Sequence, residues 1–224
     1  MFKSIFLCFG LVLAAAAYAS SDDGKQGKDE STVIPQTQNI RSITPIFSQL
    51  LLAPYPSGFV TAFENVHDSQ YIRESVLVGE NVNQWSQMIT LNGAKDLATK
   101  AGVTSQMLVE RIAGGFQHAC PTSFTAIRVS GDKIGGKEAF AAIASCGTSP
   151  TTGGKQSETA LIAVIKGDKD FYTVQWAERA TSSNTPLNLD IPKWLERYKT
   201  LAQVKLCNIV PGEQAPYPSC VDRK

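Results

Sequence analysis

The sequence predicts an α+β fold, an antiparallel sheet of about six or seven strands with helices packed on it. Strand-like runs follow one another in series instead of alternating with helices, and the loops between the last four runs are short and rich in Gly and Asp. Loops of that length connect antiparallel neighbours, because parallel strands need crossovers of about a dozen residues or more. We expect a single α+β domain over residues 46–224, since no linker divides it.

The first strands are predicted by a change of period. Residues 59–64 and 71–78 alternate between apolar and polar side chains on either side of a turn-forming segment, which is typical of a hairpin. Residues 81–85 have the composition of one helical turn. A further strand over residues 87–91 is expected to end at Asn92-Gly93, a pair that favours turns.

The clearest helix is expected after Gly102, where Thr104 or Ser105 can accept a free amide hydrogen of the first turn. Pro121 ends it, because proline cannot continue a helix. Apolar side chains recur at spacings of three and four and predict the buried stripe. They are Leu108, Ile112 and Phe116, with Met107, Val109 and Ala113 beside them.

Four strand-like runs and a last helix follow. The runs cover residues 124–130, 138–146, 158–166 and 171–179. Residues 159–165 are nearly all apolar, so we expect both faces of that strand to be covered, as in the centre of a sheet. Asp190 or Pro192 opens the helix. Its apolar side is expected to carry Trp194, Leu195, Tyr198 and Leu201 or Ala202.

Residues 1–19 have the pattern of a secretory signal peptide: Lys3 near the start, an apolar run, and small residues before a predicted cleavage after Ala19. The run is too short for a membrane anchor, and Cys8 lies inside it, away from the point where a lipid would be attached. Residues 20–45 are polar and lack an apolar period, so we expect a flexible polar leader. The mature chain is therefore expected to be periplasmic or secreted, without stable membrane insertion.

Export changes the meaning of the four remaining cysteines, because oxidising compartments favour disulfides over free thiols. Four cysteines allow three pairings, and the sequence does not select among them. We expect Cys207 to pair with Cys220, which closes a short loop containing Pro and Gly, and Cys120 to pair with Cys146. The chain contains no C-x-x-C motif, so a thioredoxin-type redox site is excluded.

Charge excludes two classes of partner. The chain has 21 basic and 20 acidic side chains, and loss of residues 1–19 removes only Lys3 from this balance, which leaves a neutral mature chain. A neutral surface lacks the electrostatic footprint that nucleic acid or a strongly anionic membrane requires. Hydrophobic residues make up 43% of the chain, which excludes wholesale disorder.

No catalytic or metal site is recognisable in the sequence. With the cysteines committed to disulfides, the two histidines, His67 and His118, are too few for a zinc site. His118 and Cys120 stand two residues apart and so face different sides of a helix. The G-x4-G-K spacing of residues 131–137 is interpreted as a hairpin turn, because Glu138 replaces the magnesium-binding Ser or Thr of a phosphate loop. We expect no metal and no cofactor.

A secreted hydrolase with a site built from residues distant in sequence stays open. His67-Asp68 in a turn could orient a base for a serine, although no G-x-S-x-G motif supplies one. A carboxylate pair for glycoside hydrolysis also stays open, and nothing in the sequence singles out two of the candidates. They are Glu64, Asp68, Glu74, Glu80, Glu110 and Glu178.

Three segments carry a resemblance to other proteins. They are Gly79-Glu80 with the following NVNQWSQMIT, then KIGGK, then IKGDKDFYTVQWAER. Over residues 55–207 the chain resembles uncharacterised secreted proteins of Gram-negative bacteria, and more distantly the PsbP-like α/β/α sandwich. The shared pattern matches at Glu80, Trp85, Met88 and Thr90. The resemblance implies a non-catalytic binding or assembly role, and it provides no catalytic residue that could be assigned to a position in this sequence.

We therefore expect a soluble periplasmic binding or assembly protein without catalytic activity, whose partner is an envelope protein or a small ligand. Its binding surface is expected near Glu80, Trp85 and Met88, together with the polar loop 147–157, because function often lies on such loops. The alternatives are the secreted hydrolase and an inhibitor or immunity-type protein of an envelope enzyme. The sequence does not separate the last of these from the first hypothesis.

Overall fold

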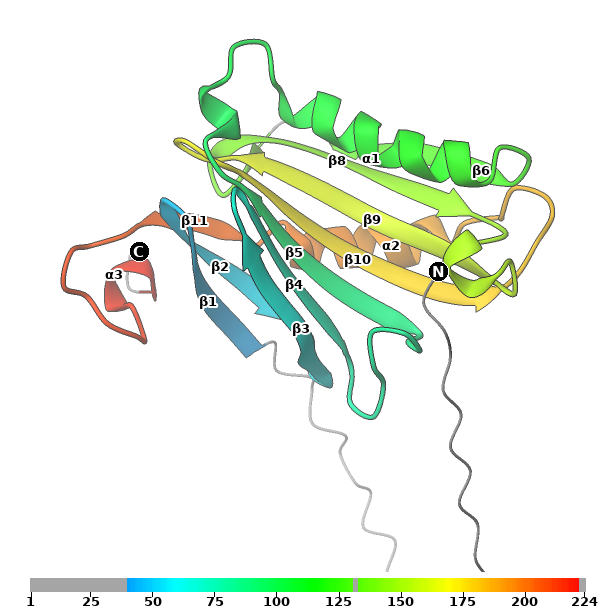
Figure 1. Cartoon of the computed structure of the whole chain (residues 1–224), viewed down its shortest axis with the longest axis horizontal. Helices are drawn as coiled ribbons and strands as arrows, with labels where there is room; N and C mark the ends of the chain where they lie inside the picture. The colour runs from blue at the N-terminus through cyan, green and yellow to red at the C-terminus, as the bar shows by residue number, and fades with distance from the viewer. Residues whose placement is uncertain (1–39, 131–132, 222–224) are drawn as a thin grey trace, which may run out of the picture. The chain divides into compact units, whose positions relative to one another are not determined.

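Two antiparallel sheets and three α-helices build the part of the chain that the computed structural model describes, residues 40–130 and 133–221 (Figure 1). The predicted signal peptide and the predicted leader up to residue 39 lie outside the described residues. The structure confirms an antiparallel α+β fold. It is richer in strands than predicted, with eight strands in the larger sheet and three in a smaller one within these ranges.

The larger sheet is antiparallel between every pair of neighbours. Its order is β3 (Phe59–His67), β4 (Gln70–Leu77), β5 (Gln87–Ala94), β10 (Phe171–Thr181), β9 (Gln156–Lys166), β8 (Lys137–Cys146) and β6 (Phe124–Ser130), and the two-residue β7 (Lys133–Ile134) pairs with β8. In β9, residues 159–165 are all buried, which confirms a central strand with both faces covered.

The smaller sheet has the order β1 (Ile40–Ile46), β2 (Gln49–Tyr55) and β11 (Lys205–Asn208). All seven residues of β2 are buried, so its sequence lacks the polar alternation from which strands are recognised. Residues 40–45, assigned from composition to the leader, belong to β1 instead. Pairing with β2 along the whole strand gives this polar stretch a partner that its composition does not reveal.

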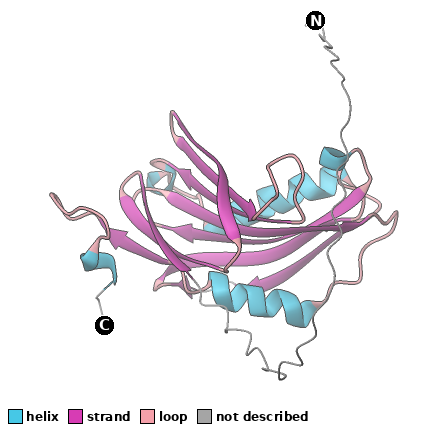
Figure 2. Cartoon of the chain, turned by 90° about the horizontal axis from the view of Figure 1, so that it is seen from below, coloured by secondary structure: helices cyan, strands magenta, loops and turns pink. Residues whose placement is uncertain are grey.

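The helices α1 (Ser105–Ala119) and α2 (Ile191–Leu201) pack on opposite faces of the larger sheet (Figures 1 and 2). Thr104 and Asp190 cap them, each accepting a first-turn amide hydrogen as predicted. The other helical segments are α3 (Pro218–Val221) and the 3-10 turns η1 (Leu97–Thr99) and η2 (Pro150–Thr152). Within the described ranges, no helix has the length and apolar character that crossing a bilayer requires.

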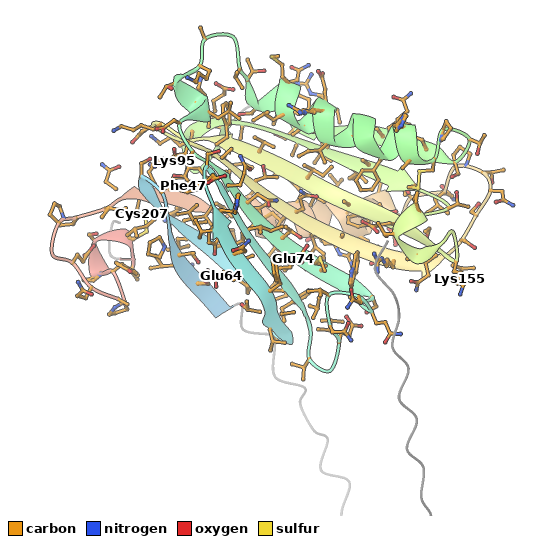
Figure 3. The ribbon with its side chains drawn as sticks, in the orientation of Figure 1. Phe47, Glu64, Glu74, Lys95, Lys155 and Cys207 are labelled. Carbon is orange, nitrogen blue, oxygen red and sulfur yellow. A yellow bond between two sulfur atoms is a disulfide. The ribbon has the colours of Figure 1, made fainter. Side chains whose placement is uncertain are left out.

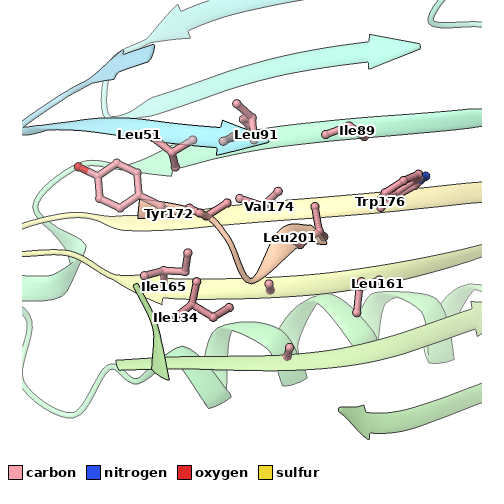
Figure 4. Packing of buried hydrophobic residues seen from close by; sticks show 14 of the residues in the cluster. Leu51, Ile89, Leu91, Ile134, Leu161, Ile165, Tyr172, Val174, Trp176 and Leu201 are labelled. Atoms are coloured by element: carbon pink, nitrogen blue, oxygen red, sulfur yellow. The ribbon is translucent and has the colours of Figure 1, made fainter. Parts of the chain in front are cut away.

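The main core lies between the larger sheet on one side and the smaller sheet with α2 on the other (Figure 4). Tyr172, Val174 and Trp176 of β10 point into it, and Leu51 of β2 and Leu201 of α2 meet them there. A second cluster lies under α1, on the opposite face of β8, β9 and β10. Since burial of each large apolar side chain contributes about 1.5–3 kcal/mol, these two clusters hold the layers together.

Both expected disulfides are present. Cys120, at the end of α1, is bonded to Cys146, at the end of β8, with an S–S distance of 2.08 Å. Cys207 of β11 is bonded to Cys220 of α3 with an S–S distance of 1.96 Å. The first bond fixes the end of α1 to the larger sheet, and the second ties the C-terminal segment to the smaller sheet.

Residues 81–85 form a turn, so the predicted helical turn is wrong. The Asn81 side-chain oxygen accepts hydrogen bonds from the backbone N–H groups of Asn83 and Gln84, at 2.9 and 3.1 Å. The backbones of Asn81 and Gln84 also pair as an isolated bridge. Asn side chains compete with helix formation in this way, by bonding to nearby backbone groups.

The strand predicted over residues 87–91 does not stop at Asn92-Gly93, because β5 continues to Ala94. Both neighbours, β4 and β10, pair with it along these extra residues. Gly93 serves packing here instead of a turn, since a Cβ at this position would come within 2.5 Å of the Ile46 side chain. The smaller sheet can therefore lie close to β5.

Each of the two predicted helix stripes contains one misplaced residue. In α1, Val109 is buried while Met107 is 52% exposed. In α2, Leu195 is 40% exposed, and Arg197 takes the buried position between Trp194 and Leu201. Periodicity predicts which way an amphipathic helix faces, but it does not anticipate that a guanidinium can be buried when it has specific partners.

Candidate functional site

One half of a sheet face is left without a helix. α1 packs mainly on β6, β8 and β9, and it does not reach over β4, β5 and the middle of β10. A groove of about 570 Å³ lies above these three strands. Its floor is the sheet itself, and residues near Trp85 and in the loop before β9 also line it.

A row of polar side chains crosses the floor of this groove. Glu74 of β4, labelled in Figure 3, lies opposite Thr90 of β5, and Thr90 lies opposite Gln175 of β10. Directly opposed side chains on one sheet face are neighbours. On β9 the next position in the row is Ile162, which is fully buried in the cluster under α1. The row is therefore polar where the face is open and apolar where the helix covers it.

Glu74 is the unpaired charge of the groove. Partial burial raises the pKa of its carboxyl, and no hydrogen bond or ion pair to a described residue opposes that shift. A buried carboxylate without a partner costs free energy, because water solvates the charged form better than the groove does. A hydrogen-bond donor or a cation brought into the groove would therefore be stabilised at Glu74.

The groove lining near Trp85 is built around Arg179 of β10. Its guanidinium carbon lies 3.7 Å from the centroid of the Trp85 ring, which is a stacked cation–π contact. Nε lies 3.3 Å from Glu158 Oε2, and Nη2 donates a hydrogen bond to Thr151 Oγ1 at 2.9 Å. The Arg179 side chain is only 7% exposed, so these contacts hold it in one orientation.

A smaller apolar pocket of about 250 Å³ adjoins the groove. Ile112 and Phe116 of α1 face Pro150 of η2 across it. Thr151 and Glu158 line both the pocket and the groove. The two spaces therefore lie side by side at Thr151 and Glu158, the pocket being apolar beside the helix and the groove polar over the open strands.

The structure brings together part of the predicted binding surface. Trp85 and Met88 both line the groove, and the loop 147–157 contributes Thr151. Glu80 does not line it, because its carboxylate accepts hydrogen bonds from Ser86 N at 3.0 Å and Ser86 Oγ at 2.6 Å. Burial opposes ionisation of Glu80, but the hydrogen bonds from Ser86 outweigh it and lower its pKa. Glu80 therefore closes the loop that carries Trp85.

Sequence reasoning does not single out Glu74, Gln175 or Arg179 as groove residues. The sequence does carry one signal for two of them. Gln175 and Arg179 are an even number of residues apart, and so on the same face, in a strand that is otherwise largely buried. Polar residues at alternate positions indicate that one face of a strand meets water. They do not indicate which strands lie beside it, so the row with Glu74 needs the register of the sheet.

The histidines do not form a catalytic arrangement in the described chain. His67 Nδ1 lies 3.0 Å from Asp68 Oδ2 in the β3–β4 turn, where the two side chains are 80% and 83% exposed. No serine hydroxyl of a described residue bonds to His67. The thiol of Cys120 is used in the disulfide with Cys146, so it cannot act as a nucleophile with His118.

The described residues were also compared with the requirements of a metal site and a phosphate site. Among residues 40–130 and 133–221, no group of three His, Cys, Asp or Glu side chains is placed to hold a metal ion. Gly135 and Gly136 have φ values of 57° and 81° in the turn that joins β7 to β8. That conformation supports the hairpin-turn interpretation of the G-x4-G-K segment, of which residues 131–132 lie outside the described chain.

Two carboxylates, Glu74 and Glu158, line the same groove, so a glycosidase pair has to be weighed. They lie three strands apart, which is about 14 Å at the usual strand spacing. Glu158 is also four residues along β9 from Ile162, the position in the row of Glu74, which adds about 13 Å along the strand. Glycosidase carboxylates lie about 5–9.5 Å apart, so this pair does not have that geometry.

Comparison with known proteins does not identify a family for this chain. No protein-family model and no curated protein matches the sequence. Among solved structures, the Ran-binding protein Mog1p of Saccharomyces cerevisiae is similar with a TM-score of 0.47 at 12% identity, over 76% of this chain and 97% of that one. A variant of protein Mog1 gives a TM-score of 0.40 at 14% identity, over 73% and 87%. Because both scores are below 0.5, nothing about function is inferred from them.

Proposed function

We propose that this protein is a non-catalytic binding protein of the periplasm or the extracellular space, and that it holds a segment of a partner protein in the groove over β4, β5 and β10. The observation that carries the proposal is the open half of a sheet face, with a row of polar side chains and the unpaired carboxylate of Glu74. Binding sites are commonly concave, with a few placed polar groups.

Binding is favoured over catalysis by what the groove contains. Its polar groups are two carboxylates, two hydroxyls, amides and one guanidinium that is already paired. Arg179 and Glu158 satisfy each other, and the two carboxylates are too far apart to work as an acid and base on one bond. Such a set can recognise hydrogen-bonding groups without a nucleophile or a proton relay.

A polypeptide partner is favoured by the charge of the groove and by the apolar pocket beside it. The polar groove and the adjoining apolar pocket have volumes of about 570 and 250 Å³, and they meet at Thr151 and Glu158. A peptide can place an apolar side chain against α1 while its next residues cross the polar row. Two acidic side chains and one basic side chain line the groove, so a partner with a Lys or Arg opposite Glu74 is favoured.

The extracytoplasmic address is part of this proposal. It is supported by the signal-peptide pattern of residues 1–19 and by the two cysteine pairs, because disulfides persist in oxidising compartments. Mass measurement of the native protein tests it. We expect a chain that begins after Ala19 and whose mature cysteines resist alkylation until they are reduced. Native protein that retains Met1 and four reactive thiols would contradict this address.

Peptide selection tests the groove. Random peptides displayed on phage are selected on the purified mature protein, and we expect the bound sequences to be enriched in a Lys or Arg that stands several residues away from an apolar residue. Glu74→Gln should weaken the selected peptides about tenfold or more, because a charge-assisted hydrogen bond contributes about 1.5–3 kcal/mol. Glu110→Gln, on the exposed side of α1, is the matched control.

Two outcomes would contradict the proposed function. One is selection that yields no basic enrichment and no saturable binding. The other is equal binding by the wild type and by Glu74→Gln, which would place the peptides elsewhere on the surface. An inhibitor of an envelope enzyme is one form of this binding function, and it requires that the partner be an enzyme whose activity falls when this protein binds it.

A further inference from the structure

A second pocket, independent of the groove, lies between the two sheets. It has a volume of about 170 Å³ and is enclosed by β1 and β2 on one side and by β3 and β4 on the other. Its polar lining comes from Ser42, Tyr55, Thr61, Arg73 and Ser75. Ser75 is 1% exposed and Tyr55 is 8% exposed, so this is an interior site that opens to solvent beside the smaller sheet.

Three polar atoms at this pocket make no hydrogen bond of ordinary length and angle to a described residue. They are Tyr55 Oη, Ser75 Oγ and Arg73 Nε. The great majority of buried polar atoms in native proteins are hydrogen-bonded, so a single orphan already calls for an explanation. Three orphans from β2 and β4 that line one pocket indicate a missing hydrogen-bonding partner in the space between them.

The other bonds of Arg73 fix its orientation. Nη1 donates to Thr44 Oγ1 at 2.7 Å, and Nη2 donates to Glu64 Oε1 at 3.0 Å. Glu64, labelled in Figure 3, also accepts from the Tyr71 hydroxyl at 2.8 Å and does not line the pocket. The guanidinium is therefore held at both ends, and its remaining donor, Nε, is not used by these contacts.

The chemistry of the orphans specifies the ligand. Nε of Arg73 can only donate, so whatever fills the pocket must offer it an acceptor. Burial raises the pKa of Tyr55, while weak hydrogen bonding with Ser75 and Arg73 opposes the shift, so its hydroxyl remains protonated and the three groups lie close together. No acidic side chain lines the pocket in the described structure. Two hydroxyl groups and the N–H of a guanidinium, all able to donate, suit an oxygen-rich anion.

We propose that the pocket between the sheets binds a small oxyanion, a carboxylate or a phosphate, through Arg73 Nε, Tyr55 Oη and Ser75 Oγ. The volume of about 170 Å³ is large enough for such an ion and too small for a nucleotide. The same space would hold about five water molecules, since each occupies about 30 Å³ in the liquid. Water is therefore the alternative occupant that the experiment has to exclude.

Titration of the dialysed mature protein tests the site. Inorganic phosphate and acetate are added separately, with ionic strength held constant by sodium chloride, and binding is followed by calorimetry and by the Nε–H resonance of Arg73 in NMR spectra. We expect saturable binding of at least one of the two anions, with a shift of that resonance. Saturation by phosphate alone, by acetate alone or by both identifies which oxyanion the site takes.

Variants that remove one donor link the binding to this pocket. Tyr55→Phe and Ser75→Ala should each weaken the anion about fivefold or more, the effect of losing one hydrogen bond. Tyr198→Phe, on α2, is the matched control and should bind like the wild type. Absence of saturable binding, or binding that both pocket variants leave unchanged, would overturn the proposal and leave water as the occupant. The Arg73 resonance of the wild type keeps the test valid if a variant fails to fold.

Discussion

Replacement of Asp170 by Asn probes the contact that joins three separate turns. Asp170 precedes β10 and is 1% exposed. Its carboxylate accepts hydrogen bonds from Ser48 N at 3.0 Å and from the Ser48 hydroxyl, in the turn between β1 and β2. It also accepts from Asp96 N at 2.7 Å, after β5, and from the Tyr172 hydroxyl at 3.1 Å. One side chain therefore connects the smaller sheet to two strands of the larger one.

The expected loss follows from these contacts. Hydrogen bonds to a charged group contribute about 1.5–3 kcal/mol each, and contributions within one network are not additive. The amide that replaces the carboxylate keeps one acceptor oxygen but turns its NH2 group toward the other donors, so about half of the bonds are lost. We expect Asp170→Asn to lower the free energy of unfolding by about 3 kcal/mol at neutral pH.

The pH dependence of this loss has a definite sign. Burial raises the pKa of Asp170, but the hydrogen bonds from Ser48 and Asp96 outweigh it and lower the pKa in the folded state. The charged form therefore stabilises the fold fully above the unfolded pKa of about 3.9, and this stability is lost as the pH falls through the folded value. The difference between wild type and Asp170→Asn should shrink below about pH 4.

Urea unfolding curves of the two proteins, at neutral and at acid pH, measure the effect. Asp168→Asn is the matched control, because Asp168 lies two residues away, has a 53% exposed side chain and pairs with Lys137 at 2.6 Å. An exposed pair contributes about 0–1 kcal/mol, so the control should unfold nearly like the wild type. Equal losses in Asp168→Asn and Asp170→Asn would refute the role assigned to Asp170.

Four further variants have expected outcomes by the same unfolding assay. Removal of the C-terminal disulfide by Cys207→Ser with Cys220→Ser should cost about 3 kcal/mol, and reducing agent should destabilise that variant less than the wild type, because only the Cys120–Cys146 disulfide is left to reduce. Gly93→Ala should cost about 1–3 kcal/mol, because its Cβ would come within 2.5 Å of the Ile46 side chain. Gly114→Ala is expected to stabilise the protein by up to about 1 kcal/mol, because a Cβ at this helix position would have nothing within 4 Å. Arg197→Met should lower the free energy of unfolding by about 2–4 kcal/mol. The guanidinium carbon lies 4.8 Å from the Trp176 ring centroid and 4.5 Å from that of Trp194, and the group also bonds to Glu178. A loss smaller than that of Asp168→Asn would contradict this prediction.

The strands that could be predicted from sequence are those with a readable period. β4 alternates because one face packs on the core and the other meets the groove, and β9 reads as continuously apolar because both faces are covered. β2 is also buried throughout, but Pro54 interrupts its apolar run, so the run does not identify a buried strand as clearly as that of β9 does. The smaller sheet depends on pairing between β2 and β11, which are about 150 residues apart in sequence, and no local pattern specifies it.

The site was predictable to the extent that its residues are local in sequence. Trp85 and Met88 share one short motif, and both line the groove. Glu80 belongs to the same motif but faces the loop, because Ser86 supplies two hydrogen bonds to its carboxylate. Arg179 reaches Trp85 only through the sheet order β5-β10, so sequence spacing carries no information about their contact. Motifs identify groups of residues, and the register decides which of their side chains share a surface.

The same polarity pattern explains why α1 stops covering the sheet where the groove begins. On the helix side, β8 presents Phe140, Ala142 and Ala144, which α1 can bury without loss of hydrogen bonds. In the polar row, Glu74, Thr90 and Gln175 would each lose water under a helix and would gain no partner from an apolar helix face. A partner that covers this half of the sheet must therefore bring its own hydrogen-bonding groups. For this reason we expect single substitutions of the polar groove-floor residues to change the binding affinity more than changes of apolar area do.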